Sequence, residues 1–154
     1  MRIKEILNIY AIGSVGYMFI EIVWRGCTHW TMGVLGGFCM LMIYFIENSF
    51  NFSRFIKAFM SACFITAAEL VTGLVVNEIL GLAVWDYSGM KYNLAGQISL
   101  VYSFLWYFLC IPAHILCRIL KHRVFDVLPL GKMRKQKFLK GSREFGKRNE
   151  LPEQ

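Results

Sequence analysis

Long apolar stretches alternate with short polar segments along this chain, and their lengths predict four membrane-spanning helices. A helix that rises about 1.5 Å per residue needs roughly 17 to 25 residues to cross the hydrocarbon core. The apolar stretches cover residues 6–24, 31–46, 58–82 and 94–120, of which the second is short for a span. None shows the sustained two-residue alternation of a strand. We expect an all-α polytopic membrane protein, with a four-helix transmembrane domain over residues 1–120.

Composition supports a membrane protein, because the chain is 56% hydrophobic and only 18% charged, which exceeds the apolar share of a typical soluble domain. The start, MRIKE before an apolar run, could also be a secretory signal. However, Glu21 interrupts the run and no small-residue cleavage site follows it. We therefore expect the first helix to be retained.

Basic residues lie mainly beside one end of the predicted helices, which predicts their orientation by the positive-inside rule. Arg2 and Lys4 precede the first helix, and Arg54 and Lys57 separate the second from the third, whereas the other two loops carry only Arg25 and Lys91. Both termini should be cytoplasmic. Residues 121–154 should form a basic cytoplasmic tail that contacts anionic lipids, because their excess of basic residues is attracted to anionic headgroups. They show no nucleic-acid-binding motif.

Polar residues recur at helical spacing on three of the predicted helices, which predicts a bundle with a shared polar interior. The three stripes are Tyr10, Ser14, Tyr17 and Glu21; Thr66, Glu69, Thr72, Gly73 and Asn77; and Ser99, Ser103, Trp106, Cys110 and His114. Serine, threonine and glycine often serve only to pack membrane helices together. Glycine lets helices approach each other closely, and this leads us to expect a homo-oligomer. The glycines concerned are Gly13, Gly16, Gly33, Gly36 and Gly37.

Glu21 and Glu69 are the two carboxylates at membrane depth, where a charged group costs roughly 2.5 to 3.5 kcal/mol. Each could be structural, or could contact a cation, a proton or a substrate. With both termini inside, they fall in the outer half of the membrane with Glu78 and Asp86, which predicts an outward-facing acidic vestibule. We expect Glu47 and Glu78, which lie near helix ends, to reach water.

Other candidates for substrate or ion binding are Asp86, Asn93 and His114, although a histidine on an apolar helix is more often a satisfied core residue. The five cysteines show no C-x-x-C spacing and are best explained as packing residues. The sequence therefore predicts neither a metal site nor a cofactor.

The loop AVWDYSGMKYNLAGQ, residues 83–97, also has a structural explanation. Trp85 and Tyr87 suit the aromatic belt at the membrane surface. Asp86 and Ser88 suit a turn, and Asn93 is a good N-cap for a helix that begins at residue 94.

The chain resembles the CmpB-like family of bacterial integral membrane proteins, also called ABC-transporter type IV or ABC transporter permeases. The family pattern is a glutamate in each of the first and third helices, then W-D-Y-S, a spacer and N-x-x-G-x-I. These positions here are Glu21, Glu69, Trp85, Asp86, Tyr87, Ser88, Asn93, Gly96 and Ile98. The resemblance covers roughly residues 10–110. The chain departs from it in having CTHWTMG, without proline, where many members carry G-P-x-x-P-I-Y-G.

This resemblance implies a small transporter or permease-like component of a bacterial plasma membrane rather than an enzyme. The chain has no G-x-x-x-x-G-K-[ST] phosphate loop, so ATP-driven transport would need a separate ATPase subunit. Two other classes stay open from the residues. One is a non-transporting interaction or regulatory protein that uses the outer loop and the basic tail. The other is a membrane enzyme that uses Glu69 with Asp86 or His114, for which no catalytic spacing is recognisable.

Overall fold

The computed structural model describes residues 3–125, and the predicted tail from residue 126 onward lies outside the described residues. The four long helices of the described part are α1 (Ile3–Arg25), α2 (Trp30–Ser49), α3 (Arg54–Gly73) and α4 (Leu100–Ile119). A π-helical segment, η1 (Leu74–Ile79), continues α3, and a second one, η2 (Leu120–Phe125), follows α4. A short antiparallel hairpin of β1 (Asn93–Leu94) and β2 (Ile98–Ser99) precedes α4.

The predicted all-α fold is confirmed, because four helices within the described residues are long and apolar enough to cross a membrane. The structure corrects the predicted bounds where local capping decides them. Ser53 starts α3 early, since its hydroxyl accepts a hydrogen bond from the backbone N–H of Ile56. The predicted start of the fourth helix was wrong by six residues, because residues 94–99 belong to a hairpin and α4 begins only at Leu100.

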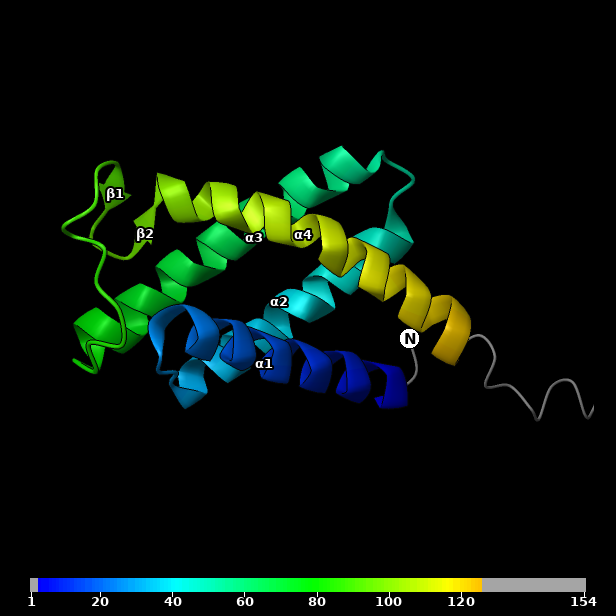
Figure 1. Ribbon diagram of the computed structural model, residues 1–154, viewed down its shortest axis with the longest axis horizontal. Helices are drawn as coiled ribbons and strands as arrows, with labels where there is room; N and C mark the ends of the chain where they lie inside the picture. The colour runs from blue at the N-terminus through cyan, green and yellow to red at the C-terminus, as the bar shows by residue number, and fades with distance from the viewer. Residues whose placement is uncertain (1–2, 126–154) are drawn as a thin grey trace, which may run out of the picture. The chain divides into compact units, whose positions relative to one another are not determined.

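The connections between the helices lie at two opposite ends of the bundle (Figure 1). The link between α1 and α2 lies at the same end as the long loop before α4, while the link between α2 and α3 lies at the end where α1 begins. The start of α1 is therefore at the same end as the C-terminal half of α4, as four spans require. That this end is cytoplasmic stays a prediction.

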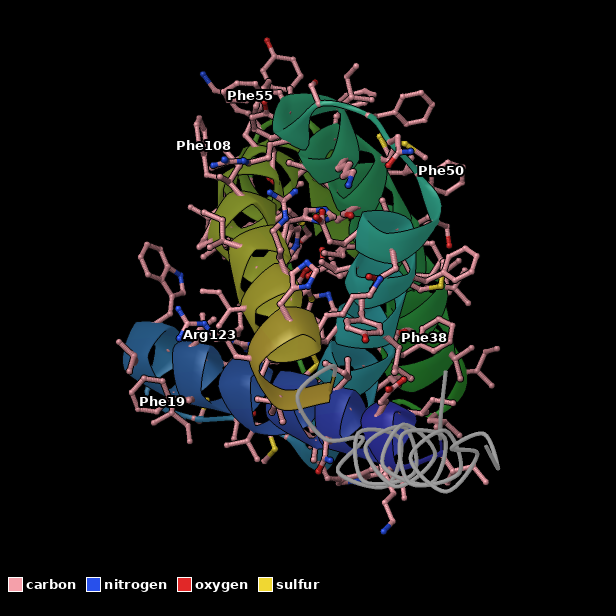
Figure 2. The ribbon with its side chains drawn as sticks, turned by 90° about the vertical axis from the view of Figure 1, so that its right-hand side faces the viewer. Phe19, Phe38, Phe50, Phe55, Phe108 and Arg123 are labelled. Atoms are coloured by element: carbon pink, nitrogen blue, oxygen red, sulfur yellow. The ribbon has the colours of Figure 1, made fainter. Side chains whose placement is uncertain are left out.

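Large apolar side chains cover the outside of the bundle. Phe19, Phe55 and Phe108 point away from the helices in Figure 2, and about two-thirds of each side chain is exposed. A soluble protein rarely exposes so many large apolar groups in continuous patches. These groups instead suit contact with lipid chains, so the protein is a multi-pass membrane protein in contact with the bilayer.

The closest helix packing is between α1 and α2, and glycine allows it. A Cβ atom on Gly13 would lie 2.3 Å from Met40 Cβ, and one on Gly36 would lie 2.3 Å from Tyr17 Cβ. Ser14 adds a hydrogen bond from its hydroxyl to the carbonyl of Gly33, at 2.7 Å. These glycines are therefore used within one chain, so they give no support to the predicted homo-oligomer, which stays a prediction.

Helix α4 meets the other helices mainly through side chains, which leaves open space beside it. A cavity of about 430 Å³ separates α4 from α1 and α2 and is lined almost wholly by apolar groups. A second, of about 600 Å³, lies between α3 and α4, where the Thr66 hydroxyl donates to Ser103 at 3.1 Å. Helix α4 is thus held at a few polar contacts rather than along its length.

Candidate functional site: a buried carboxylate beside an aromatic cavity

Three helices bring their polar stripes together around Glu69. This carboxylate lies on α3 and is only 3% exposed. The indole N–H of Trp106, on α4, donates to its Oε2 atom at 2.8 Å, and the Tyr17 hydroxyl, on α1, lies 3.5 Å from its Oε1 atom. The Tyr17 and Trp106 rings stack on each other with centroids 5.4 Å apart. The shared polar interior predicted from the three stripes is present at this level of the bundle.

Both hydrogen-bond donors to Glu69 are neutral. Among the described residues no lysine, arginine or histidine forms an ion pair with it. A buried carboxylate without a cationic partner is costly when ionised, so such a group either holds a proton or has a cation for a partner. Because Glu69 has no cationic partner among the described residues, it is the residue of the site most suited to bind a proton or a cation.

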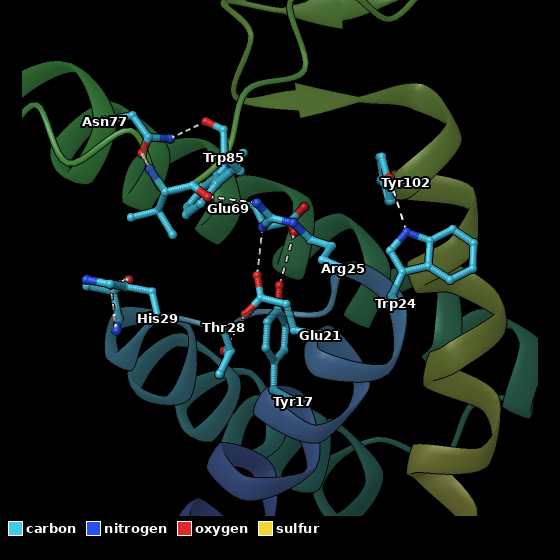
Figure 3. Close-up of polar contacts among 12 residues, drawn as sticks. Tyr17, Glu21, Trp24, Arg25, Thr28, His29, Glu69, Asn77, Trp85 and Tyr102 are labelled. Atoms are coloured by element: carbon cyan, nitrogen blue, oxygen red, sulfur yellow. Dashed lines mark hydrogen bonds and ion pairs between the residues drawn. The ribbon is translucent and has the colours of Figure 1, made fainter.

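Glu21 is also buried, at 7% exposure, but it has a cationic partner. One carboxylate oxygen accepts from Arg25 at 2.8 Å and the other from the Thr28 hydroxyl at 2.6 Å. Arg25 also donates to the carbonyl of Val84 at 2.8 Å, which ties the end of α1 to the long loop (Figure 3). Glu21 is therefore balanced in charge within the chain, unlike Glu69.

A cavity of about 250 Å³ lies beside Glu21 and beside the side chains that are hydrogen-bonded to Glu69. Glu21 and Arg25 line it directly, as do Tyr17 and Trp106, the two side chains bonded to Glu69. Glu69 is thus one side chain away from the cavity. The other two carboxylates of the predicted vestibule are elsewhere: Glu78 is exposed and accepts a hydrogen bond from Gln97, and Asp86 is in a surface turn.

The loop motif builds a compact cap over the end of η1. The Trp85 side chain is buried, and its indole N–H donates to the carbonyl of Gln97 at 2.9 Å. The Gln97 side chain, 4% exposed, contacts Asn77 at 2.8 Å and Glu78 at 3.1 Å. Gln97 could not be recognised from the sequence, because a glutamine in a polar loop is usually solvated.

Asn93 does not cap α4, so that prediction was wrong. Its amide nitrogen donates to the carbonyls of Ser88 and Met90, at 3.2 and 2.7 Å, and its oxygen accepts from the N–H of Gly96 at 3.1 Å. Gly96 has a φ of +65°, a conformation that glycine adopts without strain. Asn93 and Gly96 of the family motif therefore shape the loop.

Tyr87 connects this loop to the cavity. Its ring lines the cavity and stacks on Tyr102 with centroids 4.7 Å apart. Burial, followed by the nearby Glu69 carboxylate, raises the pKa of Tyr87 above its usual value. Its hydroxyl therefore stays protonated and neutral at physiological pH.

Asp86 forms the turn expected of it, and its loss should lower the yield of folded protein. Its two carboxylate oxygens accept from the backbone N–H and the hydroxyl of Ser88, at 2.8 and 2.9 Å, and these bonds lower the pKa of Asp86. Because the pKa of Asp86 is lower in the folded state than in the unfolded state, its carboxylate stabilises the fold above the unfolded-state pKa. This stabilisation is lost as pH falls through the folded-state pKa. We expect Asp86→Ala to reduce the yield after mild detergent extraction, whereas Lys91→Ala in the same loop should not.

Hydrogen exchange of residues 83–97 provides the second measurement. After correction for the intrinsic exchange rate at each pH, the protection of the wild-type loop should fall in acid, as pH drops through the lowered pKa of Asp86. Asp86→Ala should show low protection already at neutral pH. An equal yield for both variants, with unchanged exchange, would contradict a structural role for Asp86.

His114 lies at the other end of the bundle, in a charged cluster built around Glu47. Glu47 Oε2 is 3.1 Å from both Lys57 Nζ and His114 Nδ1, and Oε1 accepts from Arg118 at 2.7 Å. The second imidazole nitrogen of His114 is 3.0 Å from the Ser61 hydroxyl. His114 is thus a satisfied core histidine, and it is not part of the Glu69 site.

The expectation that Glu47 reaches water was wrong, since its side chain is only 6% exposed. Tyr17 and Trp106 were placed on the polar stripes but not among the candidate site residues. Their signal was available, because each is one helical turn from other polar residues on a stripe. Arg25 was used only to predict the orientation of the helices in the membrane, although its i,i+4 spacing from Glu21 predicts the ion pair between them.

Together, four apolar helices with a buried carboxylate in their interior define a multi-pass membrane protein of transporter-like architecture. A model of the family described as "Putative ABC-transporter type IV" matches residues 9–139, most of the chain, so the protein belongs to that family. The resemblance seen in the sequence is thereby confirmed. No curated protein and no solved structure matches the chain.

Proposed function

We propose that the protein is a permease-like component of the bacterial plasma membrane in which Glu69 binds a proton or a cation during transport. The observation that supports this most is the environment of Glu69: 3% exposed, bonded only by neutral donors and adjacent to a cavity. A buried structural carboxylate would be expected to have a basic partner, as Glu21 and Glu47 both do.

Glu21 has a supporting part in this proposal. It lines the cavity, so a substrate there would meet its carboxylate, but Arg25 and Thr28 already occupy both of its oxygens. A cation bound at Glu21 must compete with Arg25. Asp86 and Asn93 support the site by shaping the loop, and His114 supports the opposite end of α4.

The energy for transport comes from outside this chain. Since the sequence has no phosphate-binding loop, either the bound proton or cation is coupled to substrate movement, or a separate ATPase subunit drives it. Membership of an ABC-transporter type family supports the second arrangement. A homo-oligomer and contact of the basic tail with anionic lipids complete the proposal.

The test is Glu69→Gln, for which we expect loss of proton or cation binding with little loss of folded protein. Glutamine keeps the shape and can still accept from Trp106, while the cost of burying a charge disappears. The measurement is the carboxylic acid band in infrared difference spectra between acidic and alkaline pH, on protein in lipid nanodiscs. Glu78→Gln is the matched control, because Glu78 is an exposed carboxylate that continues the same helical span.

In the infrared difference spectra, Glu78→Gln should remove only the signal of a solvated carboxylate. If the Glu69→Gln spectra match the wild type, Glu69 does not titrate and the proposal fails. If Glu69→Gln instead lowers folded yield as much as Asp86→Ala, the carboxylate is structural, which also contradicts it.

A further inference from the structure

The walls of the cavity beside Glu69 are rich in aromatic rings. Beside the charged pair of Glu21 and Arg25, its lining includes five aromatic side chains: Tyr17, Trp24, Tyr87, Tyr102 and Trp106. Several are held by one another: Tyr17 stacks on Trp106, Tyr87 stacks on Tyr102, and the indole N–H of Trp24 donates to the Tyr102 hydroxyl at 3.4 Å. The faces of such rings attract cations, and quaternary ammonium groups are recognised in aromatic cages of this kind.

The charges at the cavity favour the same sign of ligand. Glu21 and Arg25 cancel each other, being joined at 2.8 Å. The ionised form of Glu69, one side chain behind the wall, leaves an excess negative charge that no basic group of the described residues neutralises. A cation over Tyr17 and Trp106 would be attracted both by the rings and by this carboxylate.

An apolar space adjoins this cavity. The groove of about 430 Å³ between α1, α2 and α4 shares Tyr17, Ile20, Trp106 and Leu109 with the aromatic cavity. Its walls are otherwise apolar and include Gly16, where an added Cβ would meet nothing within 4 Å. One molecule could therefore place a charged head among the aromatic rings and an apolar tail along the groove.

We infer that this composite cavity binds hydrophobic organic cations, with the cationic head in the aromatic cavity and the apolar part in the groove. The inference rests on the proposed function, because it assigns a substrate class to the site next to Glu69. A small inorganic cation would not use the aromatic walls or the groove. An anionic amphiphile would be repelled by Glu69 and would meet only the already paired Arg25.

The test is binding of three matched probes to the full chain in lipid nanodiscs, by isothermal titration with empty nanodiscs as the blank. The probes are hexyltrimethylammonium, its neutral carbon isostere 2,2-dimethyloctane, and hexanesulfonate. We expect saturable binding of the cation alone. Equal binding of the cation and its neutral isostere would overturn the inference, since partitioning into apolar space would then explain both.

Two variants separate the head from the tail. Tyr102→Leu removes one ring without touching Glu69 and should weaken binding of the cation about fivefold, the effect of one cation–π contact. Gly16→Leu fills the groove from a position with free space. It should weaken the binding of hexyltrimethylammonium, which has an apolar tail, and should leave the binding of tetramethylammonium unchanged. If neither variant changes binding, the cation binds elsewhere and the inference is wrong.

Failure of the inference can be told apart from failure of the proposed function. If Glu69 titrates but the probes do not discriminate by charge, only the substrate class is wrong. If the cation binds in a Tyr102-dependent way while Glu69→Gln leaves the infrared spectrum unaltered, the substrate class holds and coupling through Glu69 is wrong.

Discussion

Glu47→Gln should lower the free energy of unfolding by about 3 to 5 kcal/mol, the usual effect of removing one partner from a buried ion pair. The reason is the group that remains. Lys57 is almost fully buried at 4% exposure, and Glu47 is the carboxylate that lies 3.1 Å from its ammonium group. His114 and Arg118 lose the same partner, so three helices lose their common contact at this end of the bundle.

The measurement is a double-mutant cycle on unfolding in mixed micelles, with Glu47→Gln, Lys57→Met and both together. The double variant should be more stable than the sum of the single effects predicts, because neither buried charge is then left alone. Arg118→Gln is the control. Its side chain is 48% exposed, so water can replace the pair and the effect should stay within about 1 kcal/mol. Additive effects of Glu47 and Lys57 would show that the pair contributes no coupling.

Glu47 also illustrates what the sequence could not predict. It lies two residues before the end of α2, where a carboxylate next to water is the ordinary expectation. Its burial depends on the rotation of α2 and α4 about their axes, which brings His114 and Arg118 over it from a distant part of the chain. The pattern within one helix contains no information about which face a partner helix will cover.

The four spans could be predicted because their length and apolar character are local properties of the sequence. The start of the fourth span could not, since an asparagine before an apolar run has the same pattern whether it caps a helix or closes a loop. Asn93 does the second, and its partners Ser88, Met90 and Gly96 are all in the loop itself. Local hydrogen bonds here override the apolar run that follows.

For the candidate site, the stripes predicted that Tyr17, Glu69 and Trp106 would face a common interior. They did not predict that Glu69 would differ from Glu21 in having no cationic partner. That difference follows from Arg25, which reaches Glu21 on its own helix while the three helices around Glu69 offer only neutral donors.

Gly13→Ala should destabilise the protein by about 1 to 3 kcal/mol, the range typical of overpacking a tight contact. The new methyl group would lie 2.3 Å from Met40 Cβ and 2.6 Å from the carbonyl oxygen of Gly36, so the backbones of α1 and α2 must separate. Met40 Cβ is fixed to its helix and cannot rotate away. The separation would also stretch the bond from Ser14 to the carbonyl of Gly33. Unfolding in mixed micelles, followed by circular dichroism, measures the loss.

Gly16→Ala is the matched control, in the same helix and one turn later, where a methyl group meets nothing within 4 Å. Alanine has a helix propensity about 1 kcal/mol better than glycine, so this variant should be as stable as the wild type or slightly more stable. The pair also tests where the glycine contact is made. Because Gly13 meets α2 of its own chain, the loss in Gly13→Ala should not depend on protein concentration, whereas a seam between copies would weaken on dilution. A concentration-dependent loss, or a larger loss for Gly16→Ala, would show that α1 packs against another copy at this face.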